Sequence, residues 1–196
     1  NGIYHNEGKA ISKICNNLNI ATGGGIYQSN NEGSSWFRTD TGLAAAYVYD
    51  LFIDGQNIFA ASEGNGVSIS TDGGETWSYP DSAMASQSSQ AVVVKNNSVF
   101  AGGTEGILYS SNYGISWIPK NNGRGSSPSH LSSLVATANG ILASSSFGGG
   151  LNYSNNNGNY WSTITSGITD YSIERIAVNG DTAFICTYND RIFRST

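Results

Sequence analysis

Carboxylate side chains in polar segments are the residues of this sequence that could carry acid–base chemistry. Six of them fall in segments that we expect to gather on one face of the molecule, namely Glu63, Glu105, Asp190, Asp50, Asp170 and Glu174. Hydrolysis of a glycosidic bond needs two such carboxyl groups facing each other across the bond. Solvated turn residues on an acidic protein explain the same pattern. We therefore expect no catalytic residue, and keep a paired-carboxylate glycoside hydrolase as the alternative.

Aromatic side chains give the second chemical signal. Tyr47, Tyr49, Phe147, Tyr171 and Tyr188 lie in or beside the same segments. Amphipathic rings suit stacking on sugars or contact with a protein, although core packing explains several of these residues. Phe147 and Tyr188 are retained because Gly, Asn and Ser surround them. The candidate ligand-binding residues are thus Glu63, Glu105, Phe147, Tyr188 and Asp190.

The sequence lacks metal-binding and nucleophilic motifs. The two histidines, His5 and His130, lie far apart in the chain, and no Cys/His spacing resembles a zinc site. No Gly-x-Ser-x-Gly motif occurs. The glycine runs at 23–25 and 148–150 are placed between strands instead of at the start of a helix, where a phosphate loop would be. No metal and no cofactor is expected.

A motif of eight residues occurs four times, and the four copies contain all four tryptophans. Its second copy reads Ser70-Thr-Asp72-Gly-Gly74-Glu-Thr-Trp77, and successive tryptophans are 41, 40 and 44 residues apart (36 to 77, 77 to 117, 117 to 161). The recurring residues are Ser29, Asn31, Gly33 and Trp36; Ser70, Asp72, Gly74 and Trp77; Ser110, Asn112, Gly114 and Trp117; and Ser154, Asn156, Gly158 and Trp161. A period of about 40 residues indicates a repeat architecture.

Each position of the motif has a structural explanation. The serine ends a strand, and the carboxylate or amide two residues later accepts hydrogen bonds from backbone N–H groups of the turn. The glycine allows a positive φ, and the tryptophan starts the next strand with its indole packed under the turn. Three of the four copies have Asn in place of Asp, which keeps the acceptor and removes the charge. The motif is therefore predicted to be a structural clasp and not a metal site.

Ser-x-Asp-x-Gly-x-x-Trp resembles the Asp-box, or bacterial neuraminidase repeat (BNR repeat), of sialidases, sortilin-type receptors, xyloglucan-active glycosidases and photosystem assembly factors. The resemblance covers essentially the whole chain and implies a β-propeller. It leaves the function open, because one propeller scaffold hosts lectins, receptors, hydrolases and assembly factors. Sialidase activity is not expected, since the chain lacks the Arg-Ile-Pro segment that precedes the first box in that family.

Hairpin turns lie half a repeat before each box and define five units. Candidates for type I′ turns are Asn16-Asn17, Asp54-Gly55, Asn96-Asn97, Asn139-Gly140 and Asn179-Gly180. A second strand ending in small residues, a Gly-rich loop, a third strand and the box follow each turn. Each unit is thus a four-stranded antiparallel meander, which is one propeller blade. The loops between second and third strands are expected to share a face with the segments that join the blades, and binding usually resides in such loops.

The chain is predicted to be one all-β domain, 1–196, with five blades. Their approximate bounds are 11–43, 44–83, 84–125, 126–168, and 169–196 plus 1–10. The fifth unit has no fourth strand, and residues 3–10 resemble 36–43, so we expect the N-terminal strand to complete the last blade. Alternatively, residues 2–4 form a third strand of a larger propeller. Ring closure would allow a disulfide between Cys15 and Cys186, although two small buried thiols explain them better.

Composition supports the all-β class and excludes some classes of binding partner. Glycine is frequent, with 25 residues, and only 12% of residues are charged, against a typical quarter. A net charge of −5 offers no basic surface to nucleic acid, and no apolar run reaches the ~18 residues of a membrane span. We expect a secreted or cell-surface, non-catalytic module that binds carbohydrate or a protein partner, alone or within a larger polypeptide. A structural domain of a larger extracellular protein is the remaining alternative.

Overall fold

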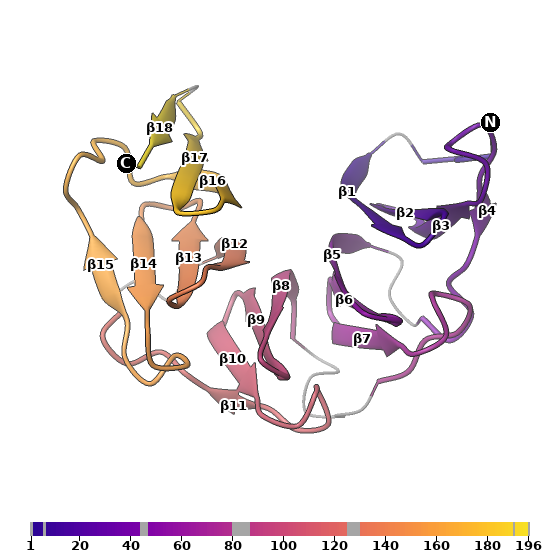
Figure 1. Ribbon diagram of the computed structural model, residues 1–196, viewed down its shortest axis with the longest axis horizontal. Helices are drawn as coiled ribbons and strands as arrows, with labels where there is room; N and C mark the ends of the chain where they lie inside the picture. Colours follow the sequence, from indigo (N-terminus) through magenta and orange to yellow (C-terminus); the bar gives the residue numbers. More distant parts are fainter. Residues whose placement is uncertain are drawn as a thin grey trace.

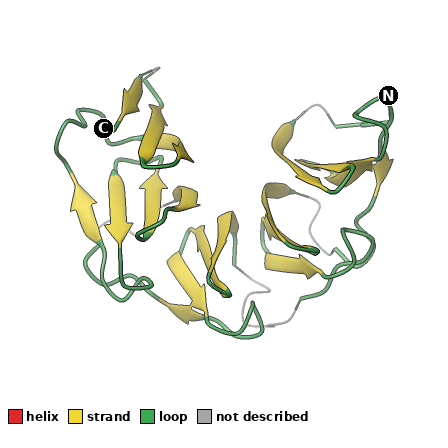
Figure 2. Cartoon of the chain, in the orientation of Figure 1, coloured by secondary structure: helices red, strands yellow, loops and turns green. Residues whose placement is uncertain are grey.

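The computed structural model describes residues 2–5, 7–43, 47–79, 87–124, 130–189 and 191–195. These residues form five small antiparallel sheets that follow one another along the chain (Figures 1 and 2). The first strand of each sheet lies on the inner side of the arc, as in the blades of a propeller (Figure 1). The predicted all-β, five-bladed propeller is confirmed. Within these ranges, no helix is long and apolar enough to cross a membrane.

Every strand pairs antiparallel with the next strand of its blade. Blade one contains β1 (Gly8–Ile14), β2 (Asn17–Thr22), β3 (Gly25–Ser29) and β4 (Phe37–Arg38); blade two contains β5 (Val48–Asp54), β6 (Asn57–Ser62) and β7 (Gly66–Ser70). Blade three contains β8 (Ser89–Lys95), β9 (Ser98–Gly103), β10 (Gly106–Ser110) and β11 (Ile118–Pro119). Blade four contains β12 (Leu131–Ala136), β13 (Ile141–Ser145), β14 (Leu151–Ser154) and β15 (Ser162–Ile164); blade five contains β16 (Ile173–Asn179), β17 (Thr182–Thr187) and β18 (Ile192–Arg194). In blade two, an isolated bridge between Ile69 and Ser78 takes the place of a fourth strand.

Tight turns join the first and second strands of the blades. The strand register gives two-residue loops at 15–16, 55–56, 96–97 and 180–181, and a four-residue loop at 137–140. Asn96 and Asn97 both have positive φ, as a type I′ turn requires. Three other predicted turns are displaced by one residue. In two of them Gly55 and Gly180 supply the positive φ at the first loop position, so the glycine sits one place earlier in the turn than predicted.

The hydrophobic core consists of four layers of apolar side chains, each between two successive blades. Second strands contribute large buried rings such as Phe59 and Phe100, which have no exposed surface. Next to them are the fully buried alanines Ala60 and Ala101. Small residues at these positions allow neighbouring sheets to approach closely, as dense core packing demands. Blade-to-blade packing therefore fixes the relative position of the loops.

Residues 2–5 lie against blade one. A Cβ atom on Gly2 would stand 2.2 Å from the carbonyl oxygen of Trp36, and one on Gly42 would stand 2.4 Å from that of Trp77. Gly2 therefore takes the same place in blade one that Gly42 takes in blade two, in the segment that leads into the blade. The expected completion of the last blade by the N-terminal strand is wrong, since blade five contains β16, β17 and β18 alone among the described residues. Residues 2–4 do not form a strand either, so the alternative of a third strand at this position is wrong.

Blades one and five lie at the two ends of an open arc (Figure 1). Each contains one cysteine, and both cysteines are free. Cys186 is half-buried, but Cys15 is exposed in the first hairpin turn, where its φ is 51°. The expectation of two buried thiols is therefore wrong, because Cys15 is exposed and Cys186 is only half-buried.

Candidate functional site

Backbone hydrogen bonds tie the loop after each second strand to the segment that leads into the same blade. The amide of Glu63 donates to the carbonyl of Tyr47 (3.0 Å), and the amide of Tyr188 donates to that of Ser172 (2.9 Å). The equivalent pairs are Gly23 with Glu7, Thr104 with Ser88, and Ser146 with His130. All five blades therefore present these loops and joining segments on one side, as predicted. This side is called the loop face below.

A β-bulge recurs at the loop-face end of every innermost strand. The register shifts between Val48 and Asp50 in β5 and between Ile173 and Arg175 in β16, with the same shift in β1, β8 and β12. A bulge leaves one residue out of the ladder and turns its side chain to a new direction. The residues so displaced are Lys9, Tyr49, Gln90, Ser132 and Glu174.

Polar and aromatic side chains cluster where blades one and two meet on the loop face. The Tyr47 hydroxyl donates to Glu7 Oε2 (2.6 Å), and Lys9 Nζ lies 3.1 Å from the same oxygen. Hydrogen bonds from Tyr47 and then Lys9 lower the pKa of Glu7. The ring centroids of Tyr47 and Tyr49 are 4.9 Å apart. Burial, followed by the charge of Glu63, raises the pKa of Tyr49, so Glu63 lies beside this tyrosine pair.

Blade four presents an aromatic pair. The ring centroids of His130 and Phe147 are 4.8 Å apart, and Phe147 remains 66% exposed. His130 has a φ of 48°, and its Nδ1 lies 3.4 Å from Nε2 of the bulge residue Gln90 in blade three. The exposed ring of Phe147 therefore packs against His130, and His130 in turn contacts Gln90 of the neighbouring blade.

Blade five presents two exposed tyrosines, Tyr171 and Tyr188, and the second is 74% exposed. Asp170 fixes the backbone around them, since its carboxylate accepts hydrogen bonds from the amide of Ser172 (3.1 Å) and from Asn189 Nδ2 (2.8 Å). These two bonds, that from Ser172 first, lower the pKa of Asp170. Asp170 is therefore an ionised anchor for the loops that carry the tyrosines.

The predicted binding residues lie in the loops of four different blades. Glu63, Glu105, Phe147 and Tyr188 belong to blades two, three, four and five, respectively, and all four are exposed. They therefore come from four successive blades of the arc. Asp190 lies outside the described residues.

Asp50 is a buried carboxylate in the first strand of blade two. Burial raises its pKa to about 6, although its oxygens accept hydrogen bonds from the amides of Val92 and Leu51 (3.0 Å each). Ser133 occupies the equivalent place in blade four, and its hydroxyl accepts from the amide of Ile176 in blade five (3.3 Å). The Asp50 side chain therefore links blade two to blade three as Ser133 links blade four to blade five. This role is structural.

All four boxes close the same hydrogen-bonded turn on the side opposite the loop face. In the second box, Ser70 Oγ donates to Asp72 Oδ1 (2.7 Å) and accepts from the amide of Gly74 (2.8 Å), while the amide of Thr76 donates to Asp72 (3.0 Å). The asparagine boxes repeat these contacts, for example Ser116 N to Asn112 Oδ1 at 2.9 Å. Across the described part of the chain, no group of three or more His, Cys, Asp or Glu residues could hold a metal ion.

The tryptophans of the boxes fall into two classes. Trp36 and Trp117 donate their indole N–H to the glycine carbonyl of their own box (3.1 Å each), as packing under the turn predicts. Trp77 and Trp161 instead donate to carbonyls of the preceding blade, those of Thr39 and Lys120 (2.8 and 2.9 Å). The second class therefore also joins one blade to the next.

Sequence reasoning missed several residues of the loop face. Glu7 and Lys9 are not among the candidate residues predicted from the sequence, and His130 enters that prediction only as a possible metal ligand. The bulges that place Lys9 and Gln90 on this face need tertiary pairing, and the sequence alone does not reveal them. A sequence signal exists for Tyr47 and Tyr49, because the two tyrosines alternate with the buried Val48 at the start of β5.

Solved β-propellers are similar to this chain. An ancestral GH74 enzyme aligns with a TM-score of 0.76 and 21% identity, over 92% of this chain and 27% of that chain. The extracellular domain of BT4673 from B. thetaiotaomicron aligns with a TM-score of 0.78 and 14% identity, over 96% and 27%. YCF48 bound to a D1 peptide aligns with a TM-score of 0.70 and 14% identity, over 99% and 65%.

These similarities establish the fold alone, because the identities are low. This chain spans about a quarter of the length of the first two proteins and just under two thirds of the third. No family model matches the chain, and no curated protein matches it in sequence.

Proposed function

We propose that this protein is a non-catalytic binding module that recognises a carbohydrate or a protein partner across the loop face. The proposal rests on one observation above all. Phe147 and Tyr188 are large aromatic side chains that remain 66% and 74% exposed on loops whose backbones are hydrogen-bonded to a rigid scaffold. Exposed aromatic anchors of this kind provide much of the binding energy in recognition sites.

Neighbouring side chains provide the polar part of such a site. The His130 ring supports Phe147, and the carboxylates Glu63 and Glu105 stand exposed in the loops of the other blades. An aromatic ring beside hydrogen-bonding groups matches the apolar faces and hydroxyls of a sugar, and equally the side chains and amides of a peptide. YCF48, a propeller of similar fold, is bound to a peptide in its solved structure.

A glycoside hydrolase is the competing function, since one propeller of similar fold is a GH74 enzyme. The contacts of the carboxylates favour binding instead. Asp50, the one with a pKa raised to about 6, accepts hydrogen bonds from the amide of Leu51 in its own strand and from that of Val92 in the next blade. Asp170 is bound to Ser172 and Asn189 in the loops of its own blade. Neither is arranged as an acid facing a base across a substrate.

The proposal extends to location and family. A surface of exposed tyrosines and few charges suits a module that works outside the cell or at its surface. The four in-phase boxes favour membership of the Asp-box propellers. Secretion is tested by expressing the complete gene in its source organism and assaying the culture medium and intact cells with an antibody.

The function is tested by screening the purified protein on a glycan array, on a peptide array and against chromogenic glycosides. Saturable binding without hydrolysis is the expected result. Hydrolysis that disappears in Glu63→Gln or Glu105→Gln, but persists in Glu32→Gln on the box side, would show that the protein is a glycoside hydrolase and not a non-catalytic binding module.

A further inference from the structure

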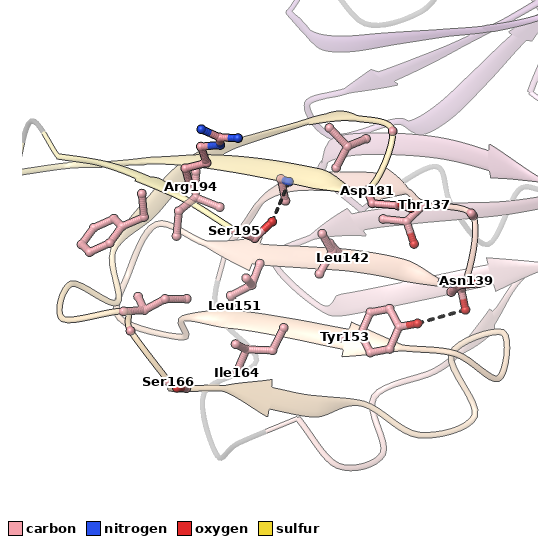
Figure 3. A pocket seen from close by; sticks show the side chains of 18 residues that line it. Thr137, Asn139, Leu142, Leu151, Tyr153, Ile164, Ser166, Asp181, Arg194 and Ser195 are labelled. Atoms are coloured by element: carbon pink, nitrogen blue, oxygen red, sulfur yellow. Dashed lines mark hydrogen bonds between the residues drawn. The ribbon is translucent and has the colours of Figure 1, made fainter.

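Two cavities in the described part of the chain differ in the chemistry of their walls. A cavity of about 490 Å³ between blades four and five has apolar walls that include Leu142, Leu151 and Ile164 (Figure 3). A surface pocket of about 360 Å³ lies between blades two and three, on the side opposite the loop face, and its volume falls within the ~300–1,000 Å³ of pockets that bind ligands. The lining of this pocket is polar and aromatic, and consists of Asn57, Asn97, Ser111, Asn112 and Tyr113.

Tyr113 lines this pocket from a strained backbone conformation. It is the fourth residue of the third box, and its φ is 61°. The other three boxes have Glu32, Gly73 and Asn157 at this position, and all of them also have positive φ. Glycine and asparagine adopt the left-handed region readily, whereas a bulky residue there is an outlier. Strain of this kind is concentrated at functional sites.

Blade two holds the ring of Tyr113 in place. The ring centroid lies 5.1 Å from that of Phe59, with an angle of 72° between the two planes. The Tyr113 hydroxyl donates to Asp54 Oδ2 and accepts from Asn57 Nδ2 (3.4 Å). Burial, followed by the hydrogen bond to Asp54, raises the pKa of Tyr113, so the phenol stays protonated. A ligand therefore meets a ring that is already fixed, and binding does not have to order it.

Three other groups of the pocket have no hydrogen-bond partner among the described residues. They are Asn57 Oδ1, the side-chain amide of Asn97 and the hydroxyl of Ser111. Asn112, by contrast, is bound to Ser110 and to Ser116 within its own box. The free groups are amide atoms and a hydroxyl, which together donate and accept hydrogen bonds, and none of them is charged. They match the hydroxyl groups of a neutral ligand.

The interface between blades one and two provides an internal comparison. Thr71 and Gly73 take the box positions of Ser111 and Tyr113 there. Gly73 carries no ring, and its carbonyl accepts a hydrogen bond from Gln28 Nε2 of blade one (3.0 Å). The aromatic wall therefore belongs to the pocket between blades two and three and not to the box motif in general.

We propose that this pocket binds one sugar ring of a neutral carbohydrate. The apolar face of the sugar packs against the ring of Tyr113. Its hydroxyl groups donate to Asn57 Oδ1 and exchange hydrogen bonds with the Asn97 amide and the Ser111 hydroxyl. This site is separate from the loop face and does not depend on the function proposed for that face.

The test titrates the intact, ¹⁵N-labelled protein with glucose, galactose, mannose and N-acetylglucosamine, each up to about 50 mM, and follows the amide signals by two-dimensional NMR. The side-chain amides of Asn57 and Asn97 report on the pocket directly. The tripeptide Gly-Ser-Gly is the control ligand, because it offers amides and a hydroxyl without a sugar ring.

Two variants and a matched control identify the groups that bind. Ser111→Ala removes an exposed hydroxyl, and Thr71→Ala removes the hydroxyl at the same position of the second box. Tyr113→Asn removes the ring and copies the residue that the fourth box has there, so the turn can keep its positive φ. Circular dichroism verifies that each variant keeps the β fold, and Ser111→Ala still tests the site if Tyr113→Asn does not.

At least one sugar should give saturable shifts at the side-chain amides of Asn57 and Asn97 and at the backbone amides of residues 111–113. The dissociation constant should rise about threefold or more in Ser111→Ala and about tenfold or more in Tyr113→Asn, with Thr71→Ala unchanged. Absence of saturable shifts at these groups with all four sugars would overturn the proposal. Equal shifts with the tripeptide, or an unchanged dissociation constant in the folded pocket variants, would overturn it as well.

Discussion

At the scale of single residues, Asp50 offers a prediction with a defined sign. Burial raises its pKa to about 6 in the folded protein, from about 4 in an unfolded chain. The neutral acid is therefore favoured by folding, and its stabilising contribution is present below pH 4 and lost as the pH rises through 6. Relative to Asp50→Asn, the wild type should lose about 1 to 3 kcal/mol of unfolding free energy between pH 4 and pH 7.

Urea denaturation of both proteins across this pH range measures the difference. A constant gap between wild type and Asp50→Asn would show that the carboxyl titrates at its ordinary pKa. The account of Asp50 as a buried link between blades two and three would then fail.

Asp72 gives the opposite sign. Hydrogen bonds from the Thr76 hydroxyl, and then from the Thr76 amide, lower its pKa to about 2. Its contribution is thus present above pH 4 and lost as the pH falls toward 2. The Asp72 side chain is exposed, and Asn112 makes the same backbone contact in the third box. Asp72→Asn should therefore lower the free energy of unfolding by less than about 1 kcal/mol at pH 7, and should leave it unchanged near pH 2. A loss above about 2 kcal/mol at pH 7 would mean that the charge holds the turn.

Individual residues of the boxes were predictable, because each turn is local. Ser70, Asp72 and Gly74 lie within five positions of one another, so their hydrogen bonds follow from sequence spacing. The pKa of Asp50 could not be foreseen, since the groups that bury it include Val92, which is 42 residues away and is brought in by blade packing.

At the scale of elements, the two classes of tryptophan should differ in their contribution to stability. Trp77 is buried between two blades and bonded to Thr39, whereas Trp117 is partly exposed and bonded within its own box. Trp77→Ala should cost roughly 3 to 5 kcal/mol, the range for removing a buried tryptophan. Trp117→Ala should cost about 1 to 3 kcal/mol. Equal losses in chemical denaturation would show that the link between blades adds nothing.

Strands and turns were largely predictable from alternation and from glycine and asparagine positions. Turn positions were displaced by one residue where Gly55 and Gly180 took the first loop position. The five β-bulges were not foreseen, because a bulge depends on how one strand pairs with the next and leaves no signature in residues such as Lys9 or Gln90.

At the scale of the whole molecule, the number of blades followed from the repeat, but the arrangement of the ends did not. Residues 3–10 resemble a fourth strand in sequence, yet Gly2 lies close to the Trp36 carbonyl in blade one. A close backbone approach of this kind is a tertiary constraint, and the sequence alone shows only a glycine.

The central claim is that exposed aromatic residues on the loop face bind a partner without turnover. The most direct measurement is isothermal titration calorimetry of the strongest array ligand with wild type, Phe147→Ala, Tyr188→Ala and the control Tyr160→Ala. Tyr160 is 57% exposed, but it lies in the fourth box on the opposite side. Phe147→Ala or Tyr188→Ala should weaken binding by about 1 to 3 kcal/mol, while Tyr160→Ala leaves it unchanged and the ligand is recovered intact. Unchanged binding in both loop-face variants, or a ligand recovered as cleaved product, would contradict the claim.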